Sequence, residues 1–200
     1  MQIISFSGLD GSGKTEQINR LAEYLRRKEK RIRTIHIIHN SIANKLLPNK
    51  TAAKNSGRAD AARTGIFTIL LRKFALFADV LLFRLALFTY KRKTDVLVAD
   101  RYFYDYLVNI YYLEKNRDPH LAPFLMHLIP APDAAYYLKV SPETANKRKT
   151  DQGIEYLDEK QYLFEKLKHR FKLVEIGEGT TDAVGKEIIR HYEHLPKIHR

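Results

Sequence analysis

The sequence has no cysteine and no tryptophan among its 200 residues. Without cysteine the chain can form neither a disulfide framework nor a catalytic thiolate, which suits a reducing compartment. The opening residues read as a strand, and they lack the charged segment and apolar stretch of a secretory signal. We therefore expect a cytoplasmic protein.

An uninterrupted apolar run of about 20 residues is also missing. Four charged residues interrupt the apolar segment 65–91: Arg72, Lys73, Asp79 and Arg84. At 100° per residue these four and Lys91 fall on one stripe of roughly 140°, which leaves a wide apolar arc. The pattern predicts one long helix, or two in succession, with surplus apolar surface. A homodimer interface, cover by a lid or neighbouring helix, and weak peripheral membrane contact each account for that surplus.

Acidic residues are scarce in the first half of the chain. Residues 1–100 hold 19 Lys and Arg against 8 Asp and Glu, whereas residues 101–200 hold 16 against 15. Basic residues at a helix end favour its dipole, and a basic face also suits a phosphorylated substrate, an anionic lipid surface or nucleic acid. No motif with interleaved aromatic residues is present, so we expect no nucleic-acid partner.

Apolar runs of strand length alternate with helical stretches along the whole chain. The five runs are residues 2–6, 33–39, 94–99, 134–140 and 172–176. Most are continuous in apolar residues, as expected of parallel strands covered on both faces. We predict one domain, residues 1–200, with an α/β fold whose open, five-stranded, mostly parallel sheet is flanked by helices.

A glycine-rich turn follows the first predicted strand and matches G-x-x-x-x-G-K-[ST] over residues 8–15. Glycines let consecutive N–H groups surround a phosphate, and the helix that follows adds its positive dipole end. We expect Lys14 to reach the β- and γ-phosphates of ATP and the Thr15 hydroxyl to ligate Mg²⁺. The residues expected at this cofactor site are Gly8, Asp10, Gly11, Ser12, Gly13, Lys14 and Thr15.

One charged residue ends the predicted strand TDVLVAD, and another follows it directly. Asp100 lies at the edge where open α/β sheets bind ligands, and a carboxylate there suits Mg²⁺ or its water shell. Arg101 suits a second phosphate, because its guanidinium binds phosphate bidentately. A carboxylate paired with its own neighbour is the structural alternative.

A short helix with basic residues at its end is predicted after the fourth strand. Ser141 is a natural N-cap and Pro142 fits the first helical position. Lys147, Arg148 and Lys149 then precede the polar loop TDQG. We predict a short lid at about residues 148–156, with Arg148 stabilising charge on a transferring phosphoryl group. A solvated helix end is the alternative.

The segments FSGLDGSGKTEQ, VLVADRY and YYLKVSPETANKRK together resemble the P-loop nucleoside monophosphate kinases, and most closely the thymidylate kinase family. This resemblance covers nearly the whole chain and implies P-loop NTPase architecture, ATP and Mg²⁺ as cofactors, and a homodimer packed through a helix such as 65–91. It further implies that Asp10 faces the acceptor's sugar, that Asp100 and Arg101 lie at the acceptor phosphate, and that Arg148 is a lid arginine.

Two segments depart from the family. HNSIANKLLPNK replaces an Arg-Pro-Gly-Gly-like turn after the second strand, and FYDYLVN replaces the Ser and Ala-Tyr-Gln that usually follow the Asp-Arg-Tyr triplet. Both replaced segments serve the acceptor in the family. The phosphoryl-donor half of the site is therefore better supported than the acceptor half.

Three functions fit these patterns. The first is ATP- and Mg²⁺-dependent phosphorylation of a nucleoside monophosphate in nucleotide biosynthesis, with dTMP as the leading acceptor. The second is the same chemistry on a sugar or lipid-linked glycan of the cell envelope, where an alcohol needs a general base and Asp10, Asp100 and Asp105 are candidates. The third is a nucleotide-binding switch without an acceptor.

Overall fold

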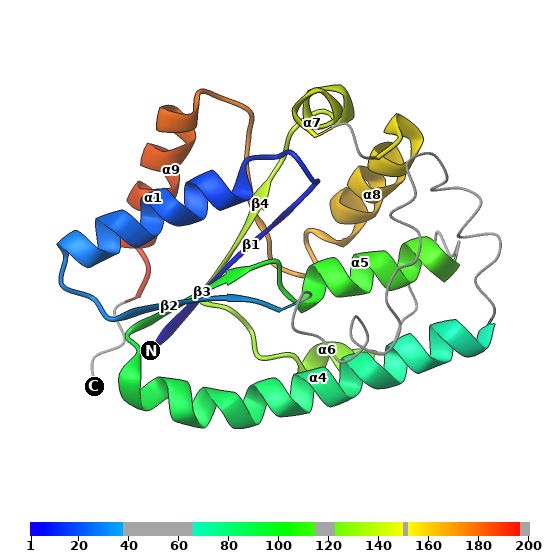
Figure 1. The fold of residues 1–200 in the computed structure, drawn as a ribbon, viewed down its shortest axis with the longest axis horizontal. Coiled ribbons are helices and arrows are strands. Elements are labelled where there is room, and N and C mark those ends of the chain that lie inside the picture. Colours follow the sequence, from blue (N-terminus) through cyan, green and yellow to red (C-terminus); the bar gives the residue numbers. More distant parts are fainter. Residues whose placement is uncertain (38–65, 115–122, 150–151, 197–200) are drawn as a thin grey trace.

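A computed structural model of the chain describes residues 1–37, 66–114, 123–149 and 152–196. In chain order the elements are β1 (Gln2–Gly8), α1 (Lys14–Arg27), β2 (Ile32–His36), α4 (Ile66–Lys93), β3 (Val96–Asp100), α5 (Phe103–Glu114), α6 (Pro123–Leu128), β4 (Ala134–Leu138), α7 (Pro142–Arg148), α8 (Ile154–Leu167), β5 (Val174–Ile176) and α9 (Thr181–Glu193). Figure 1 shows their arrangement.

The five strands form one sheet in the order β2-β3-β1-β4-β5, and every neighbouring pair is parallel. This confirms the predicted α/β fold, with a sheet that is wholly parallel. The predicted second strand, residues 33–39, is observed at Ile32–His36 and its last two positions lie outside the described residues, as does the segment HNSIANKLLPNK. β1 continues to Gly8, so the glycine-rich turn starts directly from the strand.

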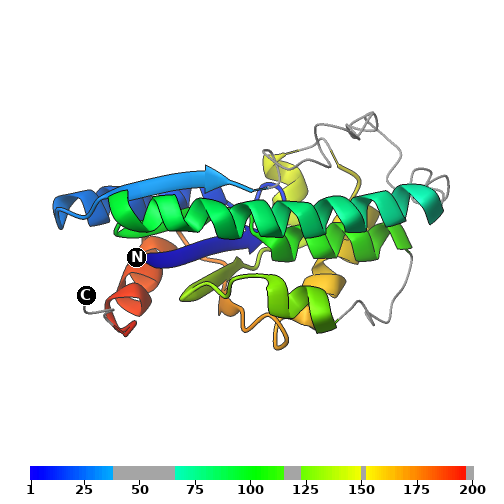
Figure 2. The same cartoon turned by 90° about the horizontal axis from the view of Figure 1, so that it is seen from below.

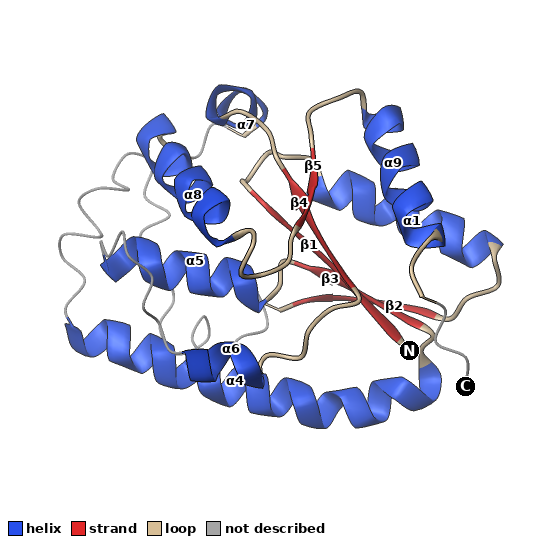
Figure 3. Ribbon diagram, turned by 180° about the vertical axis from the view of Figure 1, so that it is seen from behind, coloured by secondary structure: helices blue, strands red, loops and turns tan. Residues whose placement is uncertain are grey.

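Successive strand residues pack on opposite faces of the sheet, because side chains alternate along a strand. Ile4, Phe6 and Val98 belong to a core under α1 and α9, whereas Ile3 and Leu97 belong to a larger core with α4, α5 and α8. Figure 3 shows this layering, with α1 and α9 on one side of the strands and α4, α5, α6 and α8 on the other. Helices on both faces explain why the strands are apolar throughout.

The segment predicted as one or two long helices is a single helix, α4, of 28 residues. Seen from below, it runs across the length of the molecule (Figure 2). Lys73 forms an ion pair with Glu114 of α5, and the Arg84 guanidinium donates a 2.6 Å hydrogen bond to the Leu128 carbonyl oxygen. Charged side chains of α4 are thus used for contacts within the fold.

The outer face of α4 is apolar. Its exposed large side chains recur at helical spacing: Phe67, Leu70, Phe74, Leu81, Leu82, Leu85 and Phe88. Phe74 and Phe88 are each 69% exposed. In the described part of the chain no helix is both long enough and apolar enough to cross a membrane. We call this set of seven side chains the α4 stripe.

Candidate active site

The glycine-rich turn connects β1 to α1 at the carboxyl edge of the sheet, and we call residues 8–15 the phosphate loop. Gly13 is the N-cap of α1 with a φ of 89°, and no side chain caps the helix. A Cβ on Gly13 would meet no atom within 4 Å, so the space beside the helix terminus is open. The N–H groups of the first turn therefore remain available to an anion.

Gly11 allows the phosphate loop to touch α7. Its φ is 87°, and a Cβ would lie 2.4 Å from the carbonyl oxygen of Ala145. Arg148, at the end of α7, donates a 3.4 Å hydrogen bond to the carbonyl oxygen of Gly11. The predicted N-cap of this helix is confirmed, since Ser141 Oγ accepts from the Thr144 N–H. Arg148 thus reaches the loop, and residues 150–151 of the predicted lid, about 148–156, lie outside the described residues.

Lys14 is buried and its ammonium group lies within the loop. It donates hydrogen bonds to the carbonyl oxygens of Gly8 (3.1 Å) and Leu9 (2.5 Å) and to Ser12 Oγ (3.2 Å). Burial, reinforced by the positive charge of Arg101, lowers the pKa of Lys14 to about 7. An arriving phosphate favours the charged form of this amine, because an opposite charge raises the pKa of a cation.

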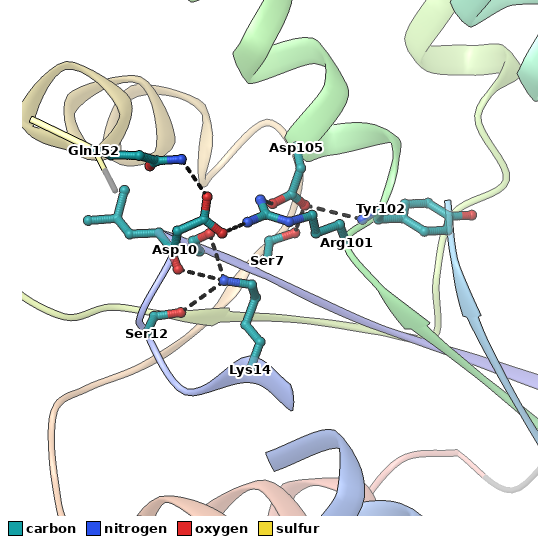
Figure 4. A network of polar contacts seen from close by, with 10 residues as sticks. Ser7, Asp10, Ser12, Lys14, Arg101, Tyr102, Asp105 and Gln152 are labelled. Carbon is teal, nitrogen blue, oxygen red and sulfur yellow. Dashed lines mark hydrogen bonds and ion pairs between the residues drawn. The ribbon is translucent and has the colours of Figure 1, made fainter. Parts of the chain in front are cut away.

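Asp10 and Arg101 meet across the carboxyl edge of the sheet (Figure 4). The Arg101 guanidinium forms an ion pair with Asp10 Oδ1, and Gln152 Nε2 donates a 2.8 Å hydrogen bond to Asp10 Oδ2. Burial alone would raise the pKa of Asp10, but Arg101 and Lys14 outweigh it and hold the pKa at about 2. The structure therefore brings together Asp10, Lys14 and Arg101, three residues for which the sequence analysis predicted roles in one active site.

Arg101 has a left-handed backbone, with a φ of 61°. This conformation is uncommon for a residue with a side chain and is typical of functional sites. It follows the last residue of β3 directly, and the Arg101 N–H donates a 3.0 Å bond to the carbonyl oxygen of Phe6 in β1. That bond fixes the turn that carries the guanidinium to the phosphate loop.

Asp105 lies behind Arg101 and is 2% exposed. Its Oδ2 accepts from Ser7 Oγ (2.5 Å) and from the Tyr102 N–H (3.1 Å), while Oδ1 accepts from Arg101 (3.4 Å). Tyr102 directly precedes α5, so this carboxylate also caps the helix. Both oxygens are engaged by the protein, and these contacts favour a role in holding Arg101 over direct access to an acceptor hydroxyl.

Asp100 and Thr15 offer the oxygen ligands expected for Mg²⁺. No hydrogen bond or ion pair engages the Asp100 carboxylate within the described ranges, and Thr15 is an exposed residue. No cluster of three or more His, Asp or Glu able to hold a metal occurs among the described residues. Since Mg²⁺ usually combines one or two protein oxygens with phosphates and water, these two residues fit it without such a cluster.

A pocket opens beside the phosphate loop on the side away from Arg101. It is lined by the start of α1, the residues after β4, the end of α7 and the turn after β5: Ser12, Gly13, Glu16, Gln17, Leu138, Lys139, Val140, Arg148, Ile176, Gly177, Glu178, Gly179, Thr181 and Val184. The loop and Arg148 thus border both this pocket and the charged network around Asp10.

Two residues of this region were not identified from the sequence. One lies in α8 and the other in the segment that leads into α8. Gln152 was part of the loop TDQG, and nothing in its surroundings marks it as a partner of Asp10. Lys160 carried a signal, because it occupies one position of a buried helix face that is otherwise apolar: Leu157, Leu163, Phe164 and Leu167. A lysine at such a position is unusual.

Comparison with known proteins gives a distant match. No family model matches the sequence. A protein of Methanococcus aeolicus described as a probable thymidylate kinase is 26% identical over 204 residues, which cover 94% of this chain and 94% of that protein. With the parallel sheet and the phosphate loop, this match supports a thymidylate kinase-like P-loop kinase.

Proposed function

We propose that the chain is a phosphotransferase that uses ATP and Mg²⁺ to phosphorylate a nucleoside monophosphate, with dTMP, converted to dTDP, as the leading acceptor. The observation that carries this proposal is the meeting of Arg101 and Asp10 beside Lys14, which sets a largely buried guanidinium next to an uncapped helix terminus. Two anion-binding groups at one edge suit the transfer of a phosphoryl group between two phosphates.

The donor half consists of the phosphate loop and the adjoining pocket. The β- and γ-phosphates would bind at the N-terminus of α1 with Lys14, and the donor's base and ribose would occupy the pocket between Arg148 and the turn after β5. Arg148, already bonded to the loop, would contact the transferring group. Mg²⁺ on Thr15 and Asp100 would neutralise phosphate charge.

The acceptor half rests on Arg101. A phosphate oxygen is already anionic, so such an acceptor needs orientation and charge neutralisation more than a strong base. The burial of Asp105, and its bonds to Ser7, Tyr102 and Arg101, argue against a base for an alcohol at that position. This favours a phosphorylated acceptor over a sugar hydroxyl.

A coupled ADP-release assay with Mg-ATP tests the function directly. We expect dTMP to stimulate turnover at least about tenfold over the rate without acceptor, because positioning supplies much of the rate in phosphoryl transfer. The panel should contain dTMP, dUMP, the other nucleoside monophosphates and no acceptor. Turnover that no monophosphate stimulates would contradict the proposal and shift it to a sugar or lipid-linked acceptor, or to a switch with slow hydrolysis alone.

We also propose that the α4 stripe is the interface of a homodimer. Phe67, Phe74, Leu81 and Phe88 recur every seven residues along a helix about 42 Å long. Lys91, Arg92 and Lys93 end the helix, and its first turn has no acidic residue. In a homodimer each α4 helix contributes one such basic end. An antiparallel pair of α4 helices would keep the two basic ends apart, so this arrangement is favoured over a parallel one.

Phe74→Glu is expected to weaken self-association by about 100-fold, because a two-fold interface would bury the added charge twice. Analytical ultracentrifugation over a range of concentrations measures the change. Tyr162→Glu, which alters an exposed aromatic residue of α8, is the control and should leave association unchanged. A wild-type chain that stays monomeric at every concentration would refute the interface, and binding to anionic vesicles would then assign the stripe to a membrane surface.

A further inference from the structure

The stem of Lys160 is buried in the middle of a hydrophobic helix face. The residue is 9% exposed and lies between Leu157 and Phe164 on the side of α8 that packs into the fold. Its ammonium nitrogen is not among the buried nitrogen and oxygen atoms that lack a partner, so the charged end reaches solvent while the stem packs against apolar side chains. A lysine held in this way presents its charge at a fixed place.

The described part of the chain supplies no carboxylate partner for this ammonium group. The ammonium nitrogen lies 4.7 Å from the ring centroid of Tyr156, and no carboxylate or hydrogen-bond acceptor contacts it among residues 1–37, 66–114, 123–149 and 152–196. A cation–π contact contributes only ~0.5–2 kcal/mol. All three donors of the ammonium group remain available to a ligand.

The surroundings of α8 place Lys160 on the acceptor side of the phosphate loop. Leu157, one turn before it on the same face, packs in a cluster with Leu9, which precedes Asp10. Tyr156 packs edge-on against Tyr112 of α5, with ring centroids 4.9 Å apart. The positive charge of Lys160 also contributes to the low pKa of Asp10. Lys160 does not line the pocket assigned to the donor.

We propose that Lys160 binds an anionic group of the phosphoryl acceptor, together with Arg101. This inference rests on the proposed function and adds to it a second cation at the acceptor phosphate, contributed by α8. The class of ligand is a phosphomonoester, since a dianionic phosphate can take hydrogen bonds from both a guanidinium and an ammonium group. Asp10, bonded to Arg101 and Gln152, would separate the two cations until the phosphate arrives.

Equilibrium binding of dTMP and of inorganic phosphate tests the assignment in the full chain, with Mg-ADP present to fill the donor side. We expect Lys160→Met to bind both probes about 10- to 100-fold more weakly, as loss of a hydrogen bond to a charged group predicts. Lys160→Arg should retain part of the binding. Lys166→Met, the same change at an exposed position of α8, is the control and should bind like the wild type. Equal binding by Lys160→Met would overturn the inference.

A second measurement separates this inference from the proposed function. Acetylation of individual lysines, followed by mass spectrometry, should be slowed at Lys160 by inorganic phosphate but not by chloride at equal ionic strength. Protection by phosphate with no response to dTMP would sustain the anion site while rejecting dTMP. No protection, or no acetylation of Lys160 under any condition, would overturn the site. The Tm of Lys160→Met distinguishes a lysine that binds an anion from one that only stabilises the fold. Removal of a purely structural lysine would lower the Tm.

Discussion

Lys14→Met is expected to slow phosphoryl transfer by about 100- to 1,000-fold, the usual cost of removing one preorganised group that stabilises transition-state charge. The same substitution is expected to raise the Tm of the unliganded protein by roughly 2–8 °C. Lys14 is buried, and burial lowers its pKa from 10.5 to about 7, which means that the fold opposes its charged form. Methionine fills similar space without a charge.

The pH dependence of this stabilisation follows from the direction of the pKa shift. Between about pH 7 and pH 10.5 the folded protein binds fewer protons at Lys14 than the unfolded chain does, so wild-type stability rises with pH in that window. Below about pH 7 both states are protonated and the cost is fully present. The stability gained by Lys14→Met should therefore be largest below pH 7 and fade towards pH 10.5.

Urea unfolding at several pH values, together with the coupled assay, measures both effects. Lys30→Met, which removes an exposed lysine far from the phosphate loop, is the control for loss of one positive charge. If Lys14→Met kept its turnover, the loop would not be the donor site. If its stability followed the same pH profile as the wild type, Lys14 would not be the buried group assumed here.

Arg101→Met is expected to lower the free energy of unfolding by about 3–5 kcal/mol, which corresponds to a fall in Tm of roughly 6–20 °C. The guanidinium lies between Asp10 and Asp105, and its removal leaves the partly buried carboxylate of Asp10 and the buried carboxylate of Asp105 without their cation. Acceptor-stimulated turnover should fall as well, because Arg101 is the cation assigned to the acceptor phosphate.

Acid should reduce the difference between Arg101→Met and the wild type. In the wild type the pKa of Asp10 is lowered to about 2, so its stabilising contribution is present above about pH 4 and lost as the pH falls towards 2. Without Arg101, burial raises that pKa, and protonation of Asp10 then relieves the variant at a higher pH. Unfolding by urea at stepped pH values follows both trends.

Two variants sharpen this experiment. Arg26→Met removes an exposed arginine from the last turn of α1 and should cost less than about 1 kcal/mol, the range for a surface charge near a helix end. Arg101→Met combined with Asp10→Asn should recover part of the lost stability, because one of the two uncompensated charges is gone. A double variant no more stable than Arg101→Met would contradict the account of the ion pair.

Local patterns predicted the parts of this structure that depend on neighbouring residues in the chain. The strands, the phosphate loop and the Ser141 cap all follow from periodicity or from spacings of a few residues. The position of Arg101 at the end of β3 could also be predicted, since the carboxyl ends of parallel strands share one edge of the sheet. The positive φ of Arg101 could not be predicted, because the backbone turn depends on a hydrogen bond to Phe6 in another strand.

Contacts between segments that are distant in the chain could not be predicted from the sequence. Ser7 and Asp105 are 98 residues apart, and only the folded chain shows that the hydroxyl donates a hydrogen bond to the carboxylate. Lys160 is a second example, because only part of its environment could be predicted from the sequence. Its apolar neighbours in the helix predict a buried stem, but the position of its ammonium group depends on how α5, α8 and the phosphate loop pack together.

The contact between Gly11 and Ala145 brings the backbones of the phosphate loop and α7 together. With 2.4 Å between the carbonyl oxygen of Ala145 and any Cβ at residue 11, only glycine allows this approach. If a nucleotide bound as proposed and shifted the loop, the shift would also displace Gly11 relative to Ala145 and Arg148, because both lie against it. The position of Arg148 would then depend on whether the donor site is occupied.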